Sequence, residues 1–209
     1  MREVTVKLYT FDELDPKAKE KARGWYREGI ESSEWADDVI EDSDTIAKIL
    51  GIDLHRDGKT IPQIYWSGFS SQGDGACFVG RYSYSRQAHY RIRSHAPIDK
   101  ELHRIADGLY ALQRIGRFKL AMDITHTGWY YDSRSVSYED ISSFEIKNAH
   151  VIVMDEIFDL LRAFMDWIYR NLERSYEWAQ ANEQVDENIQ ANEYEFTVDG
   201  TRYTERRAS

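Results

Sequence analysis

The sequence is poor in cysteine, proline and long apolar runs, and each shortage excludes a class of protein. Its single cysteine, Cys77, cannot form an intrachain disulfide, which suits a reducing compartment. Three prolines and the lack of any Ser/Gly tract argue against a long interdomain linker. No apolar run approaches the roughly 18 residues of a membrane-spanning helix, and the first residues lack an apolar signal-peptide core. We therefore expect a protein that is neither exported nor embedded in a membrane.

Acidic residues outnumber basic ones, and the chain carries a formal net charge of −10 at pH 7. Binding to DNA of any sequence depends on Lys and Arg contacts to phosphates, so we do not expect direct nucleic-acid binding. An acidic chain is instead attracted to a partner with a basic surface. The acids concentrate in residues 31–44 and 155–195 and the bases in residues 81–119. The sequence leaves open whether these stretches pair within the fold or face a partner.

One basic run is interleaved with tyrosines, a pattern that could also hold a single strand of nucleic acid. Its arginines are Arg81, Arg86, Arg91 and Arg93. We favour the alternative in which these arginines pair with acidic side chains of the same chain.

Hydrophobic periodicity predicts both helices and strands. Apolar residues spaced three or four apart indicate helices, and alternating apolar and polar residues indicate strands. The expected helices cover residues 16–30, 34–50, 98–115 and 153–192. The expected strands cover residues 4–9, 64–69, 76–84, 118–127 and 129–138, with 86–95 and 144–146 as less regular candidates. The dipeptide Asp199-Gly200, between two short β-prone runs, predicts a C-terminal hairpin.

This order of elements predicts an α+β fold. We expect a single domain with a mainly antiparallel sheet, helices on one face, and a long amphipathic C-terminal helix. Residues 1–150 would form the α+β core around a central hairpin at 64–84. Residues 151–209 would add the long acidic helix and the C-terminal β-hairpin, packed on that core.

The central hairpin contains the most suggestive loop, SSQGDG at residues 70–75. Glycines at 73 and 75 flank Asp74, so the backbone could take positive φ and present N–H groups to an anion. The ligand-binding candidates are Gln72, Gly73, Asp74 and Gly75. The GK[ST] ending of a phosphate-binding P-loop is missing, so a plain hairpin turn is the competing interpretation. No cofactor is indicated.

The segment SGFSSQGDGACF resembles a motif, roughly SGFxSQGDGACF, of a family of small proteins encoded by bacteriophages and prophages. Members of that family also tend to open with a strand and helix similar to KLYTFDELDPKAKEKARGWYRE, and their motif leads into a strand similar to VGRYSYS. The resemblance implies the host cytoplasm as the setting. It implies no activity.

No complete catalytic or metal-binding signature is present, and the six histidines lack ligand spacing. The alternative catalytic set is Asp74, His126 and Asp132. Asp123, His126 and Asp132 could meet across adjacent strands and orient an imidazole for acid–base chemistry. With the SSQGDG loop, such a site could act on a phosphate-containing nucleotide or nucleic acid. Polar residues on a half-exposed sheet face are more often solvated, and Cys77 is expected to be a small buried residue.

The acidic end of the long helix suggests a partner-binding surface. Its carboxylates could imitate the spacing of DNA phosphates and occupy a basic channel. The candidates are Glu173, Glu177, Glu183, Asp186 and Glu187. We expect a non-enzymatic phage protein that binds and inhibits a host or defence-system protein, of the anti-CRISPR or anti-restriction kind. Trp167 and Trp178 lie off the apolar stripe of the helix, which also predicts a homodimer.

Overall fold

The computed structural model describes residues 5–30, 34–58 and 60–204 and has the predicted α+β fold with antiparallel sheets. The chain forms two compact units. Unit 1 comprises Met1–Asp37 and Arg174–Ser209, and unit 2 comprises Asp38–Glu173. The boundaries fall inside helices α2 (Glu34–Leu50) and α5 (His150–Gln180) and therefore differ from the expected division at residue 150.

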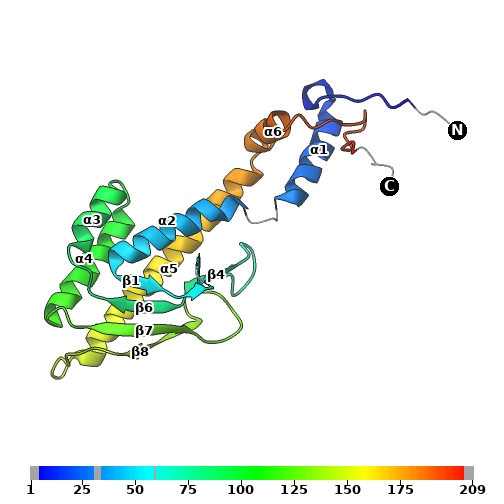
Figure 1. Ribbon diagram of the computed structural model, residues 1–209. Helices are drawn as coiled ribbons and strands as arrows, with labels where there is room; N and C mark the ends of the chain where they lie inside the picture. The colour runs from blue at the N-terminus through cyan, green and yellow to red at the C-terminus, as the bar shows by residue number, and fades with distance from the viewer. Residues whose placement is uncertain (1–4, 31–33, 59, 205–209) are drawn as a thin grey trace. The chain divides into compact units, whose positions relative to one another are not determined.

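A four-stranded antiparallel sheet is the centre of unit 2 (Figure 1). Its order is β1 (Ile52–Leu54), β6 (Gly80–Ser83), β7 (Ala121–His126) and β8 (Val136–Asp140). Burial alternates along the strands, because successive side chains point to opposite faces. The buried face carries Ile52, Leu54, Tyr82, Met122, Ile124 and Val136.

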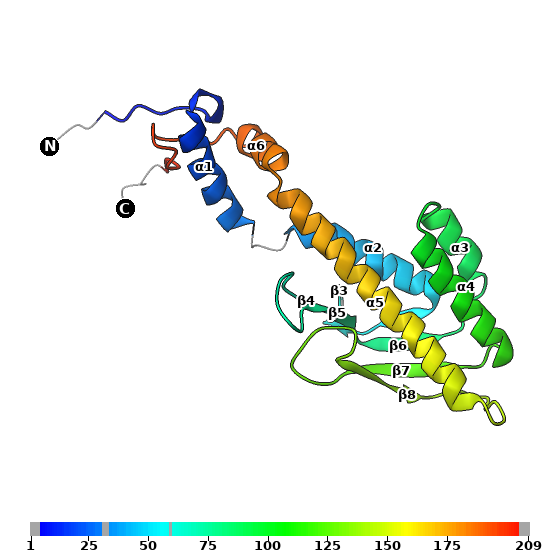
Figure 2. The same ribbon diagram turned by 180° about the vertical axis from the view of Figure 1, so that it is seen from behind.

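Helices cover that buried face, as Figures 1 and 2 show from opposite sides. They are α3 (Ala88–His95), α4 (Lys100–Ile115) and the parts of α2 and α5 that belong to unit 2. Asp99 caps α4, with its Oδ1 accepting from the N–H groups of Glu101 and Leu102 at 3.0 Å. Its other oxygen, Oδ2, accepts from Trp167 Nε1 at 2.7 Å. Trp167 is only 7% exposed, so its expected part in a homodimer surface was wrong.

Two small hairpins complete unit 2. Strand β4 (Ile64–Ser67) pairs with β5 (Gly75–Phe78), and β2 (Arg56–Asp57) pairs with β3 (Ile61–Pro62). The predicted strand at 76–84 is divided at Val79, because β5 pairs with β4 whereas β6 joins the large sheet. The central hairpin therefore extends only to residue 78.

Several predicted elements differ from the structure. Residues 88–95 form helix α3, in which Ala88 and Ile92 share the buried side one helical turn apart. The predicted strand at 129–138 begins only at Val136, and residues 144–146 form no strand. In each case a short run of apolar and polar residues fits more than one periodicity.

The terminal predictions also change. The expected strand at 4–9 is reduced to one bridge between Tyr9 and Phe196, and Val4 lies outside the described residues. The C-terminal hairpin is likewise a tight turn with a single bridge between Phe196 and Arg202. The long helix is interrupted at Ala181, which separates α5 from α6 (Asn182–Ala191).

Unit 1 combines a short 3-10 helix η1 (Phe11–Glu13), α1 (Pro16–Gly29) and α6. Its apolar core consists of Phe11, Leu14, Ala18, Ala22, Val185, Ile189 and Phe196. An ion pair joins α1 to α6, with Arg23 Nε and one terminal nitrogen each donating to Asp186 at 2.6 Å.

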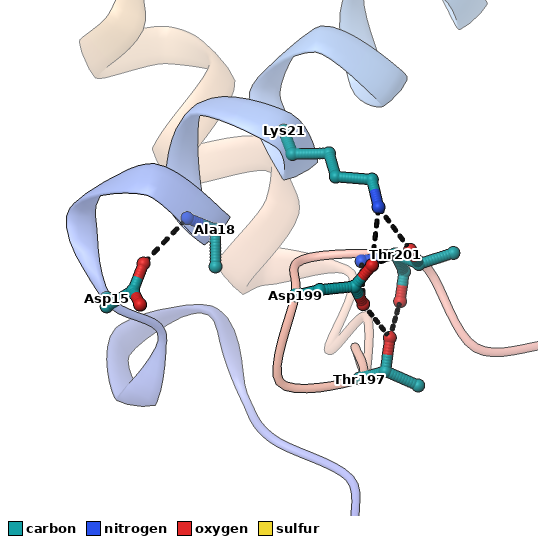
Figure 3. Close-up of polar contacts among 6 residues, drawn as sticks. All are labelled: Asp15, Ala18, Lys21, Thr197, Asp199 and Thr201. Carbon is teal, nitrogen blue, oxygen red and sulfur yellow. Dashed lines mark hydrogen bonds and ion pairs between the residues drawn. The ribbon is translucent and has the colours of Figure 1, made fainter.

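A tight turn at residues 197–201 ties the C-terminal segment to α1 (Figure 3). Lys21 Nζ donates to Asp199 Oδ2 at 2.6 Å, and Thr197 Oγ1 donates to Asp199 Oδ1 at 2.6 Å. Gly200 has φ +80°, and a Cβ there would overlap the carbonyl oxygen of Ala18. A glycine is therefore required for the turn to lie against α1.

We expect the contribution of Asp199 to stability to disappear in acid. Lys21, Thr197 and Thr201 donate to its carboxylate and hold the pKa of Asp199 well below its usual range. A carboxylate with a depressed folded-state pKa stabilises the fold above its unfolded pKa of about 3.9, and the effect is lost as pH falls towards the folded value. The melting temperature of Asp199→Asn should therefore lie below that of the wild type at pH 7, with the gap closing below about pH 4. A gap that stays constant down to pH 3 would contradict this role.

Candidate interaction site on two adjacent loops

Two loops of unit 2 lie against each other, and we call them the paired loops. One is residues 68–74 between β4 and β5, and the other is residues 127–135 between β7 and β8 (Figures 1 and 2). A Cβ at Gly75 would lie 2.5 Å from the Cα of Asp132, and a Cβ at Gly73 would overlap the ring of Tyr130. Glycines of the SSQGDG motif are thus required for the second loop to pack against the first.

Asp74 closes its own loop. Its Oδ2 accepts from the backbone N–H of Ser70 at 2.9 Å and of Ser71 at 2.5 Å. These donors are therefore already bonded to a carboxylate of the loop itself. Gly73 has the expected positive φ of +91°, whereas Gly75 is not among the residues with positive φ. The prediction that Gly75 takes a positive φ was therefore wrong. A glycine is required at this position because a Cβ would overlap Asp132.

His126 and Asp132 also bind backbone groups. His126 Nε2 donates to the carbonyl oxygen of Tyr130 at 2.8 Å, and its ring centroid lies 5.7 Å from that of Tyr65 and 5.4 Å from that of Tyr131. Asp132 Oδ1 accepts from the N–H of Arg134 at 2.7 Å. The structure therefore brings the candidate catalytic residues onto neighbouring segments, where Asp74 holds its own loop and His126 and Asp132 hold the loop at residues 127–135.

The remaining residues of the catalytic hypothesis face elsewhere. Asp123 accepts from Arg81 Nε at 2.7 Å, and Gln72 is exposed. Cys77 is fully buried in β5, as predicted, and burial together with the nearby charge of Asp132 raises its pKa to about 12. A thiol with this pKa is protonated at neutral pH and is a poor nucleophile. Within the described ranges, no three His, Cys, Asp or Glu side chains are grouped to hold a metal ion.

The paired loops expose large aromatic side chains. Trp129 is 95% exposed and Tyr130 is 60% exposed. The next residue, Tyr131, stacks on Tyr65 with ring centroids 5.6 Å apart and an angle of 15° between the planes. An exposed tryptophan thus lies two residues before a tyrosine whose ring is packed. Gly128, with φ +116°, breaks the chain after β7 as the sequence suggests, but the strand predicted from Trp129 begins only at Val136.

A second group of aromatic side chains supports the loop at residues 68–74. Tyr169 of α5 donates through its hydroxyl to the carbonyl oxygen of Gly68 at 3.0 Å. Its ring centroid lies 5.6 Å from that of Phe69, which stacks on Trp66 at 6.1 Å. Both loops are therefore fixed by aromatic side chains from the sheet and helix of unit 2.

The acidic partner-binding candidates divide into two kinds. Asp186 forms the two hydrogen bonds with Arg23 that join α1 to α6, so its expected role as a free contact was wrong. Glu173 is half-buried. The exposed members are Glu177, Glu183 and Glu187.

Part of the charge is paired within the fold, which was one of the two alternatives left open by the sequence. Arg81 pairs with Asp123 at 2.7 Å, and Arg93 pairs with Asp107 at 2.6 Å. Asp44 of the acidic stretch 31–44 accepts from Arg56 at 2.7 Å. Arg81 and Arg93 therefore pair with acidic side chains of the same chain, which is the alternative that we favoured for them.

Comparison with known proteins identifies a family by sequence. Residues 35–182, more than half of the chain, match the model of a family described as a domain of unknown function, DUF8835. The match includes all of unit 2 and both paired loops. Neither the curated proteins nor the solved structures contain a match. In the described part of the chain, no helix combines the length and apolar character needed to cross a membrane.

We expect Gly75→Ala to destabilise unit 2. The new methyl group would overlap the backbone of Asp132, and such overpacking typically costs about 1–3 kcal/mol. The matched control is Gly24→Ala, because Gly24 lies in α1 with nothing within 4 Å of its added Cβ. Alanine is the better helix former, so that control should be neutral or stabilise by up to about 1 kcal/mol. Denaturant unfolding measures both, and equal effects would refute the close approach of the loops.

Proposed function

The chain belongs to the DUF8835 family, and we propose that it is a non-enzymatic binding protein that attaches to a partner protein through the paired loops. The observation that carries the proposal is the 95% exposure of Trp129 on a loop that Tyr131 anchors by stacking on Tyr65. Isolated exposed aliphatic residues are common on protein surfaces, but a nearly fully exposed tryptophan forgoes the large gain from burying an indole.

Binding is supported over catalysis by the hydrogen bonds of the polar residues. Asp74, His126 and Asp132 each bond to a backbone group of the paired loops, so these residues have a structural role that requires no substrate. The alternative is an enzyme or ligand-binding protein that acts on a phosphate compound through SSQGDG and His126. A role in holding the loops accounts for all three side chains.

The physical properties of the paired loops suit recognition of a protein. Trp and Tyr dominate binding hot spots because they bury a large area while losing few rotatable bonds. Stacking of Tyr131 on Tyr65 and packing of Asp132 on Gly75 order the loop before binding. A pre-ordered loop loses less conformational entropy on association, which favours affinity.

The proposed partner is a host or defence-system protein with a basic surface. The resemblance of SGFSSQGDGACF to a bacteriophage and prophage motif supports this setting, in the host cytoplasm, and an inhibitor of the anti-CRISPR or anti-restriction kind. The net charge of −10 supports a basic partner, because long-range attraction accelerates encounter whichever residues make the final contact.

Trp129→Ala should abolish capture of the partner. Truncating a hot-spot tryptophan costs at least about 2 kcal/mol, which weakens binding roughly 30-fold. The matched control is Trp178→Ala, since Trp178 is also exposed, at 62%, but belongs to unit 1. Affinity capture from phage-infected cells, quantified by mass spectrometry against both variants, measures the effect.

The expected result is one protein with a basic surface that is retained by wild type and Trp178→Ala and lost with Trp129→Ala. Equal retention by all three proteins would reject the paired loops as the interface. If the captured protein is a second copy of this chain, retained by wild type and Trp178→Ala and lost with Trp129→Ala, the result would instead support the homodimer.

Reversing the exposed acidic charges should slow association with that partner. The variant carries Lys in place of Glu177, Glu183 and Glu187 and leaves Asp186 intact, because Asp186 binds Arg23. Exposed substitutions usually change stability by less than about 0.5 kcal/mol each, so the variant should fold. Its association rate should fall more than that of the matched Glu→Gln variant, and the loss should shrink at high salt. Unchanged association rates across a salt series would remove these carboxylates from the proposal.

A further inference from the structure

A cavity in unit 1 has five aromatic side chains among its lining residues. Its volume is about 660 Å³, within the usual range of small-molecule sites. The aromatic walls come from α1, the start of α2, the end of α5 and the C-terminal segment. They are Trp25, Tyr26, Trp35, Trp178 and Tyr194, and Arg202 is at the same cavity.

Contacts among the lining side chains and with neighbouring residues hold these walls in place. The ring of Trp25 meets the ring of Tyr194 edge-on, with centroids 5.2 Å apart. The ring of Trp35 meets that of Tyr176 at 5.2 Å, and Ser175 Oγ donates to the Trp35 carbonyl oxygen at 2.7 Å. The cavity is therefore formed before any ligand arrives, which lowers the entropy cost of binding.

Arg202 supplies a positive charge to the cavity. Its guanidinium carbon lies 4.6 Å from the ring centroid of Trp25 and 4.4 Å from that of Tyr194. Arg23 of the same unit pairs with Asp186, but no carboxylate among the described residues forms an ion pair with Arg202. The two rings hold the guanidinium by cation–π contact and leave its hydrogen-bond donors for an anion.

We propose that this cavity binds a small molecule that combines one planar aromatic ring with one anionic group. The ring lies against the indole and phenol walls, and the carboxylate or phosphate binds the Arg202 guanidinium, whose planar fork matches either anion. Glu28 also lines the cavity and repels additional negative charge, which favours a single anionic group over a polyphosphate. Mononucleotides and aromatic carboxylates share this chemistry.

Tryptophan fluorescence provides the test, because three of the six tryptophans of the chain line the cavity. Adenosine 5′-monophosphate and indole-3-acetate each carry a ring and an anion, whereas adenosine lacks the anion and inorganic phosphate lacks the ring. We expect saturable quenching by adenosine 5′-monophosphate, by indole-3-acetate, or by both. The uncharged analogue should bind about tenfold more weakly than its anionic counterpart, and inorganic phosphate should cause no quenching. The stronger of the two anionic probes distinguishes a nucleotide from an aromatic carboxylate.

Two variants separate a binding role of these residues from a structural one. Arg202→Gln should weaken binding of the anionic probe about tenfold while leaving that of adenosine unchanged, a difference that a purely structural role would not produce. Trp178→Ala removes an exposed wall of the cavity and should weaken the binding of all ring-bearing probes. This variant keeps the test informative if Arg202→Gln fails to fold. Trp129→Ala, in unit 2, is the control that should bind as wild type.

The proposal is overturned if no probe gives saturable quenching up to about 10 mM, a concentration well above a millimolar Kd. Saturable binding of adenosine as tight as that of adenosine 5′-monophosphate, or unchanged binding of the ring-bearing probes by Trp178→Ala, would overturn it as well. These outcomes are independent of the paired-loop proposal, which depends on Trp129 and a different unit.

Discussion

The close approach of Asp132 to Gly75 is the contact on which the paired loops depend. A Cβ at position 75 would lie 2.5 Å from the Asp132 Cα, so only glycine lets the second loop lie against β5. Once the loop is there, Tyr131 can stack on Tyr65 and His126 can bind the Tyr130 carbonyl oxygen. Trp129, in the same loop, extends to solvent and is 95% exposed.

Several acidic side chains form ion pairs or hydrogen bonds within the fold. Asp186 joins α6 to α1 through Arg23, and Asp199 joins the C-terminal turn to α1 through Lys21. Asp74 bonds to the N–H groups of its own loop, where an anion would otherwise be expected to bind. A count of acidic residues therefore overestimates the surface available for mimicry of DNA, and only the exposed carboxylates without such bonds remain candidates.

The two candidate sites differ in chemistry and in their relation to the family. The paired loops belong wholly to the segment that matches DUF8835, and they offer exposed aromatics on an ordered base. The cavity of unit 1 is lined largely by residues outside that segment, among them Trp25, Tyr194 and Arg202.

The sequence by itself determined the α+β class, the amphipathic helices α1, α2, α4 and α5, the glycine-containing hairpin and the burial of Cys77. Each of these follows from local periodicity or turn chemistry, which a short window of residues contains. The tertiary structure alone decided the division into two units, the pairing of Arg23 with Asp186, the packing of Asp132 on Gly75 and the cavity between Trp25 and Arg202. These contacts join residues far apart in sequence, and no local pattern records which distant backbone or side chain will fill the space beside a residue.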